Sequence, residues 1–289
     1  MTAYLSIRNL TVTLTGGTPI LRDVSLDVVA GQVHGLVGES GAGKSMIGKA
    51  VLGTLPRALT ISSGEIWLDG VNILTLKPSQ RRQRIGAIAA LIPQDPLTAL
   101  NPSKRIGPQI TRRLVDILGW SKQVATARAL ELLAEVQIPD PVRVMRTYPH
   151  ELSGGMRQRI LIASAFAAEP KLIIADEPTT ALDVTVQKQI LRLIANMQTR
   201  HNTALLFVTH DLGVVSKVCD TLSVLYAGKV VEDARMYRFF MRPVHPYSAA
   251  LLAATPTYTD LTGSPTPVPT KVIKAVEQEI QEHDMRARR

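Results

Sequence analysis

The sequence predicts an α/β fold with a mainly parallel central sheet, an N-terminal antiparallel β subdomain and an inserted helical segment. Three observations support this prediction. Residues 4–30 alternate apolar and polar side chains, as half-buried antiparallel strands do. Later apolar runs at 88–93, 171–176 and 204–210 are typical of buried parallel strands. Between these two patterns, a glycine-rich loop follows an apolar strand and opens a helix, the context of a phosphate-binding loop.

The N-terminal part is expected to form the antiparallel β subdomain. Strands are predicted at 4–14 and 20–29, with glycines and a proline marking the break between them. The segment 64–73 adds another antiparallel piece, in which Asp69-Gly70 supplies the turn.

A long and mainly helical stretch lies between the first two parallel strands. It covers about residues 95–168 and is expected to be a helical subdomain inserted into the sheet domain. Within it, residues 121–137 have the pattern of an amphipathic helix. The residues that lie close to one face of that helix are Val124, Ala127, Leu130, Ala134 and Gln137.

The C-terminal part changes character after a last predicted hairpin at 221–233, which turns at Ala227-Gly228. A helical string follows, then a proline- and threonine-rich stretch that is most simply a linker, then a charged, helix-like tail. We therefore divide the chain into a main α/β domain at 1–235, which contains the helical subdomain, and a C-terminal extension at 236–289.

Composition excludes several classes of protein. A hydrophobic content of 45% is ample for a packed core and argues against disorder. The longest nearly apolar run, 160–168, is too short to span a bilayer, and the first residues lack the regions of a signal peptide. We therefore expect a cytosolic protein that associates with a membrane only through partners.

Charge and cysteine content narrow the classes further. The formal net charge is +9, and its basic residues are dispersed, which favours solvated surface charge over a dedicated nucleic-acid patch. The single cysteine, Cys219, excludes an internal disulfide and a cysteine-only metal cluster. It is expected to be a small buried hydrophobic residue.

Residues 38–45 read GESGAGKS and fit the phosphate-binding pattern G-x-x-x-x-G-K-[ST]. The glycines allow backbone N–H groups to approach phosphates, and the following helix adds its positive end. Lys44 is expected to bridge the β- and γ-phosphate oxygens, and the Ser45 hydroxyl to ligate Mg²⁺. The predicted nucleotide-binding residues of this loop are Gly38, Glu39, Ser40, Gly41, Ala42, Gly43, Lys44 and Ser45.

Two adjacent carboxylates stand at the end of the apolar run 171–176. Asp176 is expected to hold Mg²⁺ through water, and Glu177 to orient or deprotonate the attacking water. Adjacent residues at a strand end point to opposite sides, which allows the two carboxylates to divide these roles.

The string LSGGM at 152–156 opens a further helix. Ser153 is well placed as its N-cap, and Gly154 and Gly155 expose N–H groups at a positive helix end. One nucleotide needs only one phosphate-binding loop. The economical explanation is a two-fold dimer in which each ATP lies between Lys44 of one subunit and Ser153 of the other. An ordinary capped helix is the alternative.

These three strings together resemble the ATP-binding subunits of ABC transporters over about residues 4–255. The resemblance implies a P-loop NTPase fold that uses ATP and Mg²⁺, with Glu177 as the catalytic base. Gln94 matches the family's Q-loop, which senses the γ-phosphate and contributes to the Mg²⁺ site. His210 matches the catalytic switch histidine that contacts the γ-phosphate. Asp183 matches the loop that crosses to the other subunit.

One position departs from the family pattern. Family members usually stack adenine on an aromatic residue about two dozen positions before the phosphate-binding loop, where this chain has Leu14 and Thr15. An aliphatic contact loses part of the stacking energy, on the order of 1 kcal/mol.

Two further strings resemble the branch of oligopeptide, dipeptide and nickel importers. They are DPLTALNP at 95–102 and HPYSAALLAATP at 245–256. Many members follow the second string with a cysteine-rich stretch that binds an iron–sulfur cluster. With Cys219 as its one cysteine, this chain is expected to lack that cluster.

The resemblance implies the ATPase subunit of a bacterial importer for oligopeptides or dipeptides, at the cytoplasmic face of the inner membrane. The expected partners are two transmembrane permease subunits, a second ATPase subunit and a periplasmic substrate-binding protein. A nickel importer is the first alternative. A soluble ABC ATPase that acts on nucleic acid is the second, and stable nucleic-acid binding at physiological salt would favour it.

Overall fold

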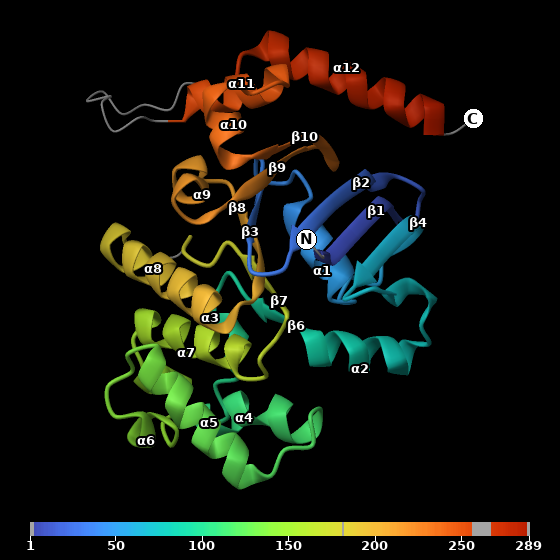
Figure 1. Cartoon of the computed structure of the whole chain (residues 1–289). Helices are drawn as coiled ribbons and strands as arrows, with labels where there is room; N and C mark the ends of the chain where they lie inside the picture. The colour runs from blue at the N-terminus through green and yellow to red at the C-terminus, as the bar shows by residue number, and fades with distance from the viewer. Residues whose placement is uncertain (1–2, 181, 256–266, 288–289) are drawn as a thin grey trace.

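The computed structural model of the chain describes residues 3–180, 182–255 and 267–287 (Figure 1). Its strands are β1 (Ala3–Leu14), β2 (Pro19–Val29), β3 (Val33–Val37), β4 (Leu59–Leu68), β5 (Val71–Asn72), β6 (Ala89–Ile92), β7 (Leu172–Asp176), β8 (Ala204–Thr209), β9 (Thr221–Tyr226) and β10 (Lys229–Arg235). Its helices are α1 (Lys44–Val51), α2 (Pro78–Ile88), α3 (Pro96–Ala99), α4 (Ile106–Asp116), α5 (Lys122–Glu135), α6 (Pro141–Val144), α7 (Gly154–Phe166), α8 (Val184–His201), α9 (Leu212–Val218), α10 (Met236–Met241), α11 (Pro246–Ala254) and α12 (Thr270–Ala287), with short 3-10 helices η1 (Ile73–Thr75) and η2 (Pro149–Glu151). Of the helices described, none has the length and apolar character needed to cross a membrane.

The central sheet has six strands in the order β10-β9-β3-β8-β7-β6. Strands β9, β3, β8, β7 and β6 run parallel, and β10 joins as an antiparallel edge strand through the predicted Ala227-Gly228 turn. Every residue of β3 and β8 is buried, as expected for parallel strands covered on both faces. The three predicted apolar runs are thus confirmed as parallel strands, and their carboxyl ends lie at one edge of the sheet.

A second, antiparallel sheet packs beside the first. Its order is β2-β1-β4-β5, and β4 turns into β5 at Asp69-Gly70, as the sequence predicts. Inward-facing side chains of this sheet, such as Leu5, Ile7 and Ile66, share a buried cluster with Ile47 of α1. Because α1 follows the phosphate-binding loop, this core fixes the loop between the two sheets.

Helices α4, α5, α6 and α7 gather at one end of the molecule, below the sheet in Figure 1. The amphipathic helix predicted at 121–137 exists as α5, but the predicted face was wrong. Val124 is 55% exposed, whereas the buried side chains of α5 are Ala125, Ala129, Leu132 and Leu133. Both sets have helical spacing. Packing against α4 and α7 selects the second set, whose leucine pair fills the larger volume.

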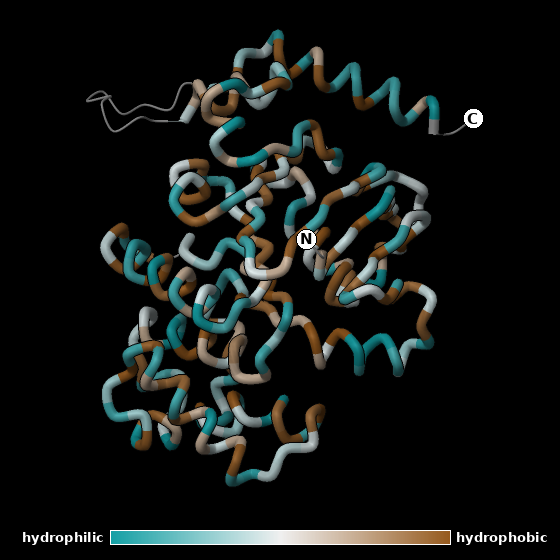
Figure 2. The backbone as a smooth tube through the Cα atoms, viewed as in Figure 1, coloured by the Kyte–Doolittle hydropathy of each residue, from teal (hydrophilic) through white to brown (hydrophobic). Residues whose placement is uncertain are grey.

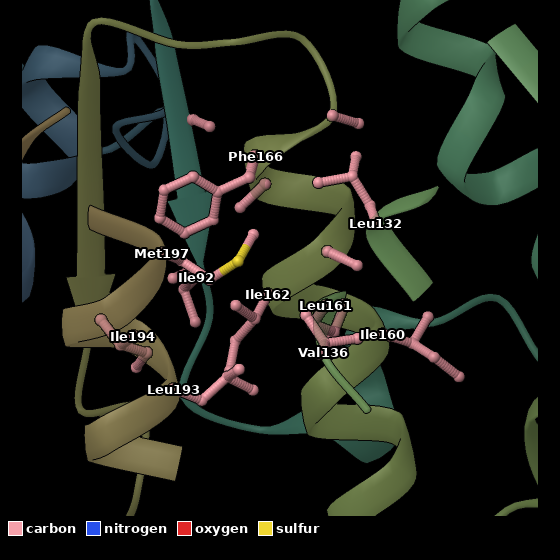
Figure 3. Close-up of a cluster of buried hydrophobic side chains, with 14 of the residues drawn as sticks. Ile92, Leu132, Val136, Ile160, Leu161, Ile162, Phe166, Leu193, Ile194 and Met197 are labelled. Carbon is pink, nitrogen blue, oxygen red and sulfur yellow. The ribbon is translucent and has the colours of Figure 1, made fainter. Parts of the chain in front are cut away.

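The main core lies between the central sheet and α7 and α8. Figure 3 shows Ile162 and Phe166 of α7 facing Leu193 and Met197 of α8 beside the sheet. In the hydropathy view of Figure 2, α2 and much of α12 are hydrophilic. Alternate residues of β8 belong to this cluster and to the cluster that contains Ile47, so the central sheet is packed on both of its faces.

The chain after β10 folds back over the sheet at the top of Figure 1. Phe239 of α10 and Tyr247 of α11 are fully buried, together with Val276 and Ile280 of α12. The predicted charged tail is thus confirmed as a helix docked on the domain. Most of the predicted proline- and threonine-rich linker lies outside the described residues.

Candidate functional site

The phosphate-binding loop runs from the end of β3 to the start of α1, the predicted strand–loop–helix arrangement. A side chain at Gly38 would place its Cβ 2.2 Å from the Leu225 carbonyl oxygen, so only glycine fits there. Gly43 has φ +101°, a conformation that glycine adopts readily, and it leads into α1 without a side-chain cap. The first N–H groups of α1 are therefore left available for an anion.

Lys44 folds back over the loop that precedes it. Its Nζ donates to the carbonyl oxygens of Gly38 at 2.8 Å and Glu39 at 2.9 Å, and lies 3.9 Å from a Glu177 carboxylate oxygen. Burial lowers the pKa of Lys44, and the neighbouring Glu177 charge opposes that shift. A buried cation with a weak ion pair is well suited to attract phosphate oxygens.

Ser45 and Asp176 meet across the loop, as predicted for a metal site. The Ser45 hydroxyl donates to Asp176 Oδ1 at 2.8 Å. Burial raises the pKa of Asp176, and the Ser45 hydrogen bond opposes the shift. Both groups supply the hard oxygen donors that Mg²⁺ prefers. In the part of the chain described, no three histidine, cysteine or acidic residues are grouped where they could hold a metal ion.

Glu177 is the centre of the polar network at this edge. Its φ is +45°, and its N–H donates to Val208 O at the end of β8. His210 Nδ1 lies 3.2 Å from one Glu177 oxygen, while Gln94 Nε2 at 3.4 Å and the Thr180 hydroxyl at 3.0 Å donate to the other. The ends of β6, β7 and β8 thus bring Gln94, Glu177 and His210 together, as their predicted positions require.

Thr180 is a site residue that the sequence prediction missed. Its hydroxyl bonds the Glu177 carboxylate, and its N–H donates to Glu177 O at 3.3 Å, one turn along the chain. A hydroxyl residue three positions after a predicted catalytic carboxylate is the signal that could have identified it.

The LSGGM string lies at the start of α7, with Ser153 as the N-cap. The Ser153 hydroxyl accepts from the Met156 N–H at 3.3 Å, and a Cβ added at Gly154 would meet no atom within 4 Å. Among the described residues, no hydrogen bond or ion pair links Ser153, Gly154 or Gly155 to the phosphate-binding loop. This predicted group is therefore open, separate from the cluster around Glu177.

Asp183 caps α8 and stays exposed. Its carboxylate accepts from the N–H groups of Thr185 at 3.0 Å and Val186 at 2.9 Å. Buried Gln158 of α7 donates to Pro178 O at 2.9 Å, next to Glu177. The helix that carries the LSGGM string is thus attached to the loop that carries the Glu177 carboxylate, on the same side of the chain as Asp183.

The departure at the expected adenine position is visible in the structure. Leu14 is 38% exposed at the end of β1, and the Thr15 hydroxyl donates to Ala58 O at 3.0 Å. Neither side chain offers an aromatic face to a base.

Cys219, expected to be a buried hydrophobic residue, packs against the core, and burial raises the pKa of its thiol.

Comparison with known proteins assigns the fold and the family. The family profile described as ABC transporter matches residues 21–180, and a profile described as an AAA domain matches residues 146–216. A probable D,D-dipeptide transport ATP-binding protein of Escherichia coli strain K12 is 48% identical over 84% of this chain and 74% of its own length. An oligopeptide transport ATP-binding protein of Bacillus subtilis strain 168 is 43% identical over 89% of this chain and 73% of its own.

Solved structures show the same arrangement of elements. The chain is similar to cbiO1 from Clostridium perfringens, part of the ABC transporter complex cbiONQ, with a TM-score of 0.73, 25% identity, and coverage of 84% of this chain and 92% of that one. The ATP-binding cassette MJ0796, in a dimeric post-hydrolysis state with ADP and Pi, matches with a TM-score of 0.70 over 80% and 98% of the chains. Its identity of 24% supports the fold alone.

Proposed function

The chain belongs to the ATP-binding subunits of ABC transporters, and on that premise we propose that it powers a bacterial importer of dipeptides or oligopeptides. The observation that carries the proposal is the convergence of Lys44, Glu177 and His210 at one sheet edge, in a chain whose relatives are peptide-transport ATPases by name. Those names favour peptides over nickel, the alternative that the sequence left open.

We assign the site residues as follows. The loop 38–45 binds the ATP phosphates, with Lys44 on the β- and γ-phosphates. Ser45 and Asp176 would hold Mg²⁺, with Gln94 nearby, and the ion would withdraw charge from the transferred phosphoryl group. Glu177 accepts the proton of the attacking water, and His210 holds the Glu177 carboxylate and the γ-phosphate in place. The close approach of Lys44 to Glu177 keeps this carboxylate at the phosphate end of the site.

We further propose that Ser153, Gly154, Gly155 and Asp183 act on a nucleotide held by a second ATPase subunit. The open N-terminus of α7 offers backbone N–H donors to phosphate oxygens. A paralogous ATPase chain is the expected partner in the cell. Hydrolysis removes the γ-phosphate contacts and releases the two subunits from each other.

The surface after Gln94 is the proposed contact with the permease. Asp95 caps α3, Pro96 is buried, and the helix, which packs against α7, exposes Leu97, Thr98 and Ala99. Two prolines, Pro96 and Pro102, stiffen this link from the nucleotide site. In this arrangement the stretch 95–102 and the helix at about 106–118 receive a cytoplasmic helix of the permease, and the subunit lies at the inner face of the membrane.

Reconstitution with its two permease subunits tests the proposal. The complex in vesicles, supplied with its periplasmic binding protein, should hydrolyse ATP faster with a dipeptide or oligopeptide, and Glu177→Gln should abolish peptide uptake. Stimulation by nickel and not by peptides would contradict the proposed substrate.

Ala99→Glu tests the permease contact separately. It should leave hydrolysis by the isolated subunit nearly unchanged and disrupt assembly or stimulation, because it places a charge on the proposed docking surface. The matched control is Ala127→Glu, at another exposed alanine, on α5. Normal uptake by the Ala99→Glu complex would place the docking surface elsewhere.

A further inference from the structure

The C-terminal helix α12 lies over the N-terminal sheet and the β9–β10 hairpin, far in sequence from the phosphate-binding loop (Figure 1). Arg22 of β2 links them. Its Nε donates to both carboxylate oxygens of Asp284 in α12, at 2.9 and 3.1 Å. Both side chains are largely buried, with exposures of 15% and 24%, so water screens this charge-assisted pair only in part.

The other end of Arg22 holds the turn between β9 and β10. Its Nη1 donates to Ala227 O at 2.6 Å, and its backbone N–H donates to Gly228 O at 2.8 Å. Gly228 has no room for a side chain, since an added Cβ would lie 2.0 Å from Ile20 O. The turn is therefore fixed against β2 by both the side chain and the backbone of Arg22.

The Ala227-Gly228 turn also contacts the phosphate-binding loop. The Gly228 N–H donates to Ala42 O at 2.8 Å. In a planar trans peptide the carbonyl and the following N–H point in opposite directions. Holding the Ala42 carbonyl toward the turn therefore points the Gly43 N–H away from it, toward the side where the loop receives phosphate.

The helix that carries Asp284 is itself anchored at several points. Val276 and Ile280 are buried beside Phe239 and Tyr247. Glu279 accepts from Lys229 Nζ at 2.8 Å, next to the same turn, and lies 3.2 Å from His245 Nε2. Asp284 is therefore held at a defined place over Arg22.

A second contact joins the extension to the loop at Glu39. Tyr247 of α11 is fully buried, with its ring 4.7 Å from that of Tyr226 at the end of β9. Among the described residues its hydroxyl has no well-aligned hydrogen-bond partner, and burial together with the nearby Glu39 carboxylate raises the pKa of Tyr247. The extension thus lies close to the loop at Glu39 and reaches Ala42 indirectly, through Arg22 and the Ala227-Gly228 turn.

We propose that Asp284 is a positioning residue for nucleotide binding, which acts through Arg22 and the Ala227-Gly228 turn on the Ala42 carbonyl. The C-terminal extension then helps to shape the nucleotide site, with Asp284 acting on the loop through other residues. This inference rests on the proposed function of the 38–45 loop, because it assumes that this loop binds ATP.

Fluorescence titration of the full chain with an ATP analogue tests the proposal. Asp284→Asn should raise the dissociation constant, and the KM for ATP, about fivefold, while kcat changes less than twofold, because the γ-phosphate residues are untouched. Glu282→Gln is the matched control, since this exposed carboxylate has its partners within α12 itself. It should bind ATP like the wild type. An unchanged dissociation constant for folded Asp284→Asn would overturn the proposal.

A double-mutant cycle distinguishes positioning from general loosening. If Asp284 acts through Arg22, the combination of Arg22→Ala and Asp284→Asn should bind no more weakly than Arg22→Ala alone. Additive losses would overturn the proposal. If Asp284→Asn is too unstable for titration, Arg22→Lys replaces it and should show a similar rise, because it lacks the fork that reaches both Asp284 and Ala227. Wild-type binding by folded Arg22→Lys would count against the proposal.

Lys44→Ala in the same titration separates the two levels of inference. If Lys44→Ala binds ATP like the wild type, the proposed nucleotide site is wrong, and the inference about Asp284 falls with it. If Lys44→Ala loses binding while Asp284→Asn retains it, the role of Asp284 alone is wrong.

Discussion

Two helix N-termini in this chain look alike in sequence and differ in what surrounds them. At the start of α1, Lys44 covers its own loop and faces Glu177, while Ser45 bonds Asp176. At the start of α7, the Ser153 hydroxyl accepts from Met156 N–H, and Gly154 faces open space. The first end carries a cation and two carboxylates, whereas the second presents backbone donors, and its first basic side chain, Arg157, comes one turn into the helix.

We therefore regard the α1 end as a phosphate-binding site and the α7 end as a surface that adds contacts to a phosphate bound elsewhere. The α1 end combines a cation with two carboxylates, the kind of set that phosphoryl transfer uses. The α7 end can contribute hydrogen bonds to a phosphate, but it has no counterpart of this set. The chain is therefore expected to use its α7 end on a nucleotide that another subunit holds.

Lys44→Ala should have the largest effect on ATP binding, because it removes the cation at the start of α1. We expect ATP binding to be abolished, measured by equilibrium titration, with Lys122→Ala at an exposed position of α5 as the control. If Lys44→Ala still bound ATP, the cation would not be what distinguishes the start of α1 from the start of α7.

Glu177→Gln should preserve ATP binding and slow hydrolysis by at least about a hundredfold, the scale of a lost general base. The rate of hydrolysis is measured as the release of inorganic phosphate at saturating ATP. Glu169→Gln, which changes an exposed carboxylate just before β7, is the control and should hydrolyse normally. Near-normal hydrolysis by Glu177→Gln would remove Glu177 from the catalytic role.

Ser153→Arg alters the open end alone. Binding of ATP by the monomer should remain intact, while hydrolysis falls about tenfold or more, the effect of losing a hydrogen bond to a charged group. Ser121→Arg is the matched control, because Ser121 caps α5 in the same way, accepting from Val124 N at 3.2 Å. Equal losses from the two variants would mean that capping alone explains the effect.

Glu279→Gln should have the smallest effect and concerns only the docking of α12. The hydrogen bond from Lys229 lowers the pKa of Glu279 below its ordinary value of 4.5. Its stabilisation is therefore present above that value and is lost as pH falls through the lowered pKa. The side chain is 45% exposed, so the loss at neutral pH should be under about 1 kcal/mol.

Thermal unfolding against pH measures the Glu279 effect, with Glu282→Gln as the control. The difference between Glu279→Gln and the wild type should disappear in acid, where both side chains are uncharged. A difference that persists there would assign the effect to packing rather than to charge.

The sequence was most informative where strand patterns and motifs coincide. Buried parallel strands end at Asp176, directly before Glu177, and at Thr209, directly before His210, so the meeting of Glu177 with His210 follows from strand direction. The face of α5 could not be predicted in the same way, because two helical stripes were apolar enough and only the packing partners decide between them. The link from Asp284 to Arg22 spans 262 positions, and no local pattern predicts such a pair.

Mixing Lys44→Ala with Ser153→Arg tests the shared site most directly. In a mixed dimer one composite site carries both changes and the other carries neither. If the α1 and α7 ends of different chains complete each site, two inactive proteins should together recover part of the wild-type hydrolysis, most at equal amounts. Complete inactivity at every mixing ratio, under conditions where the wild-type chain hydrolyses ATP, would contradict the account.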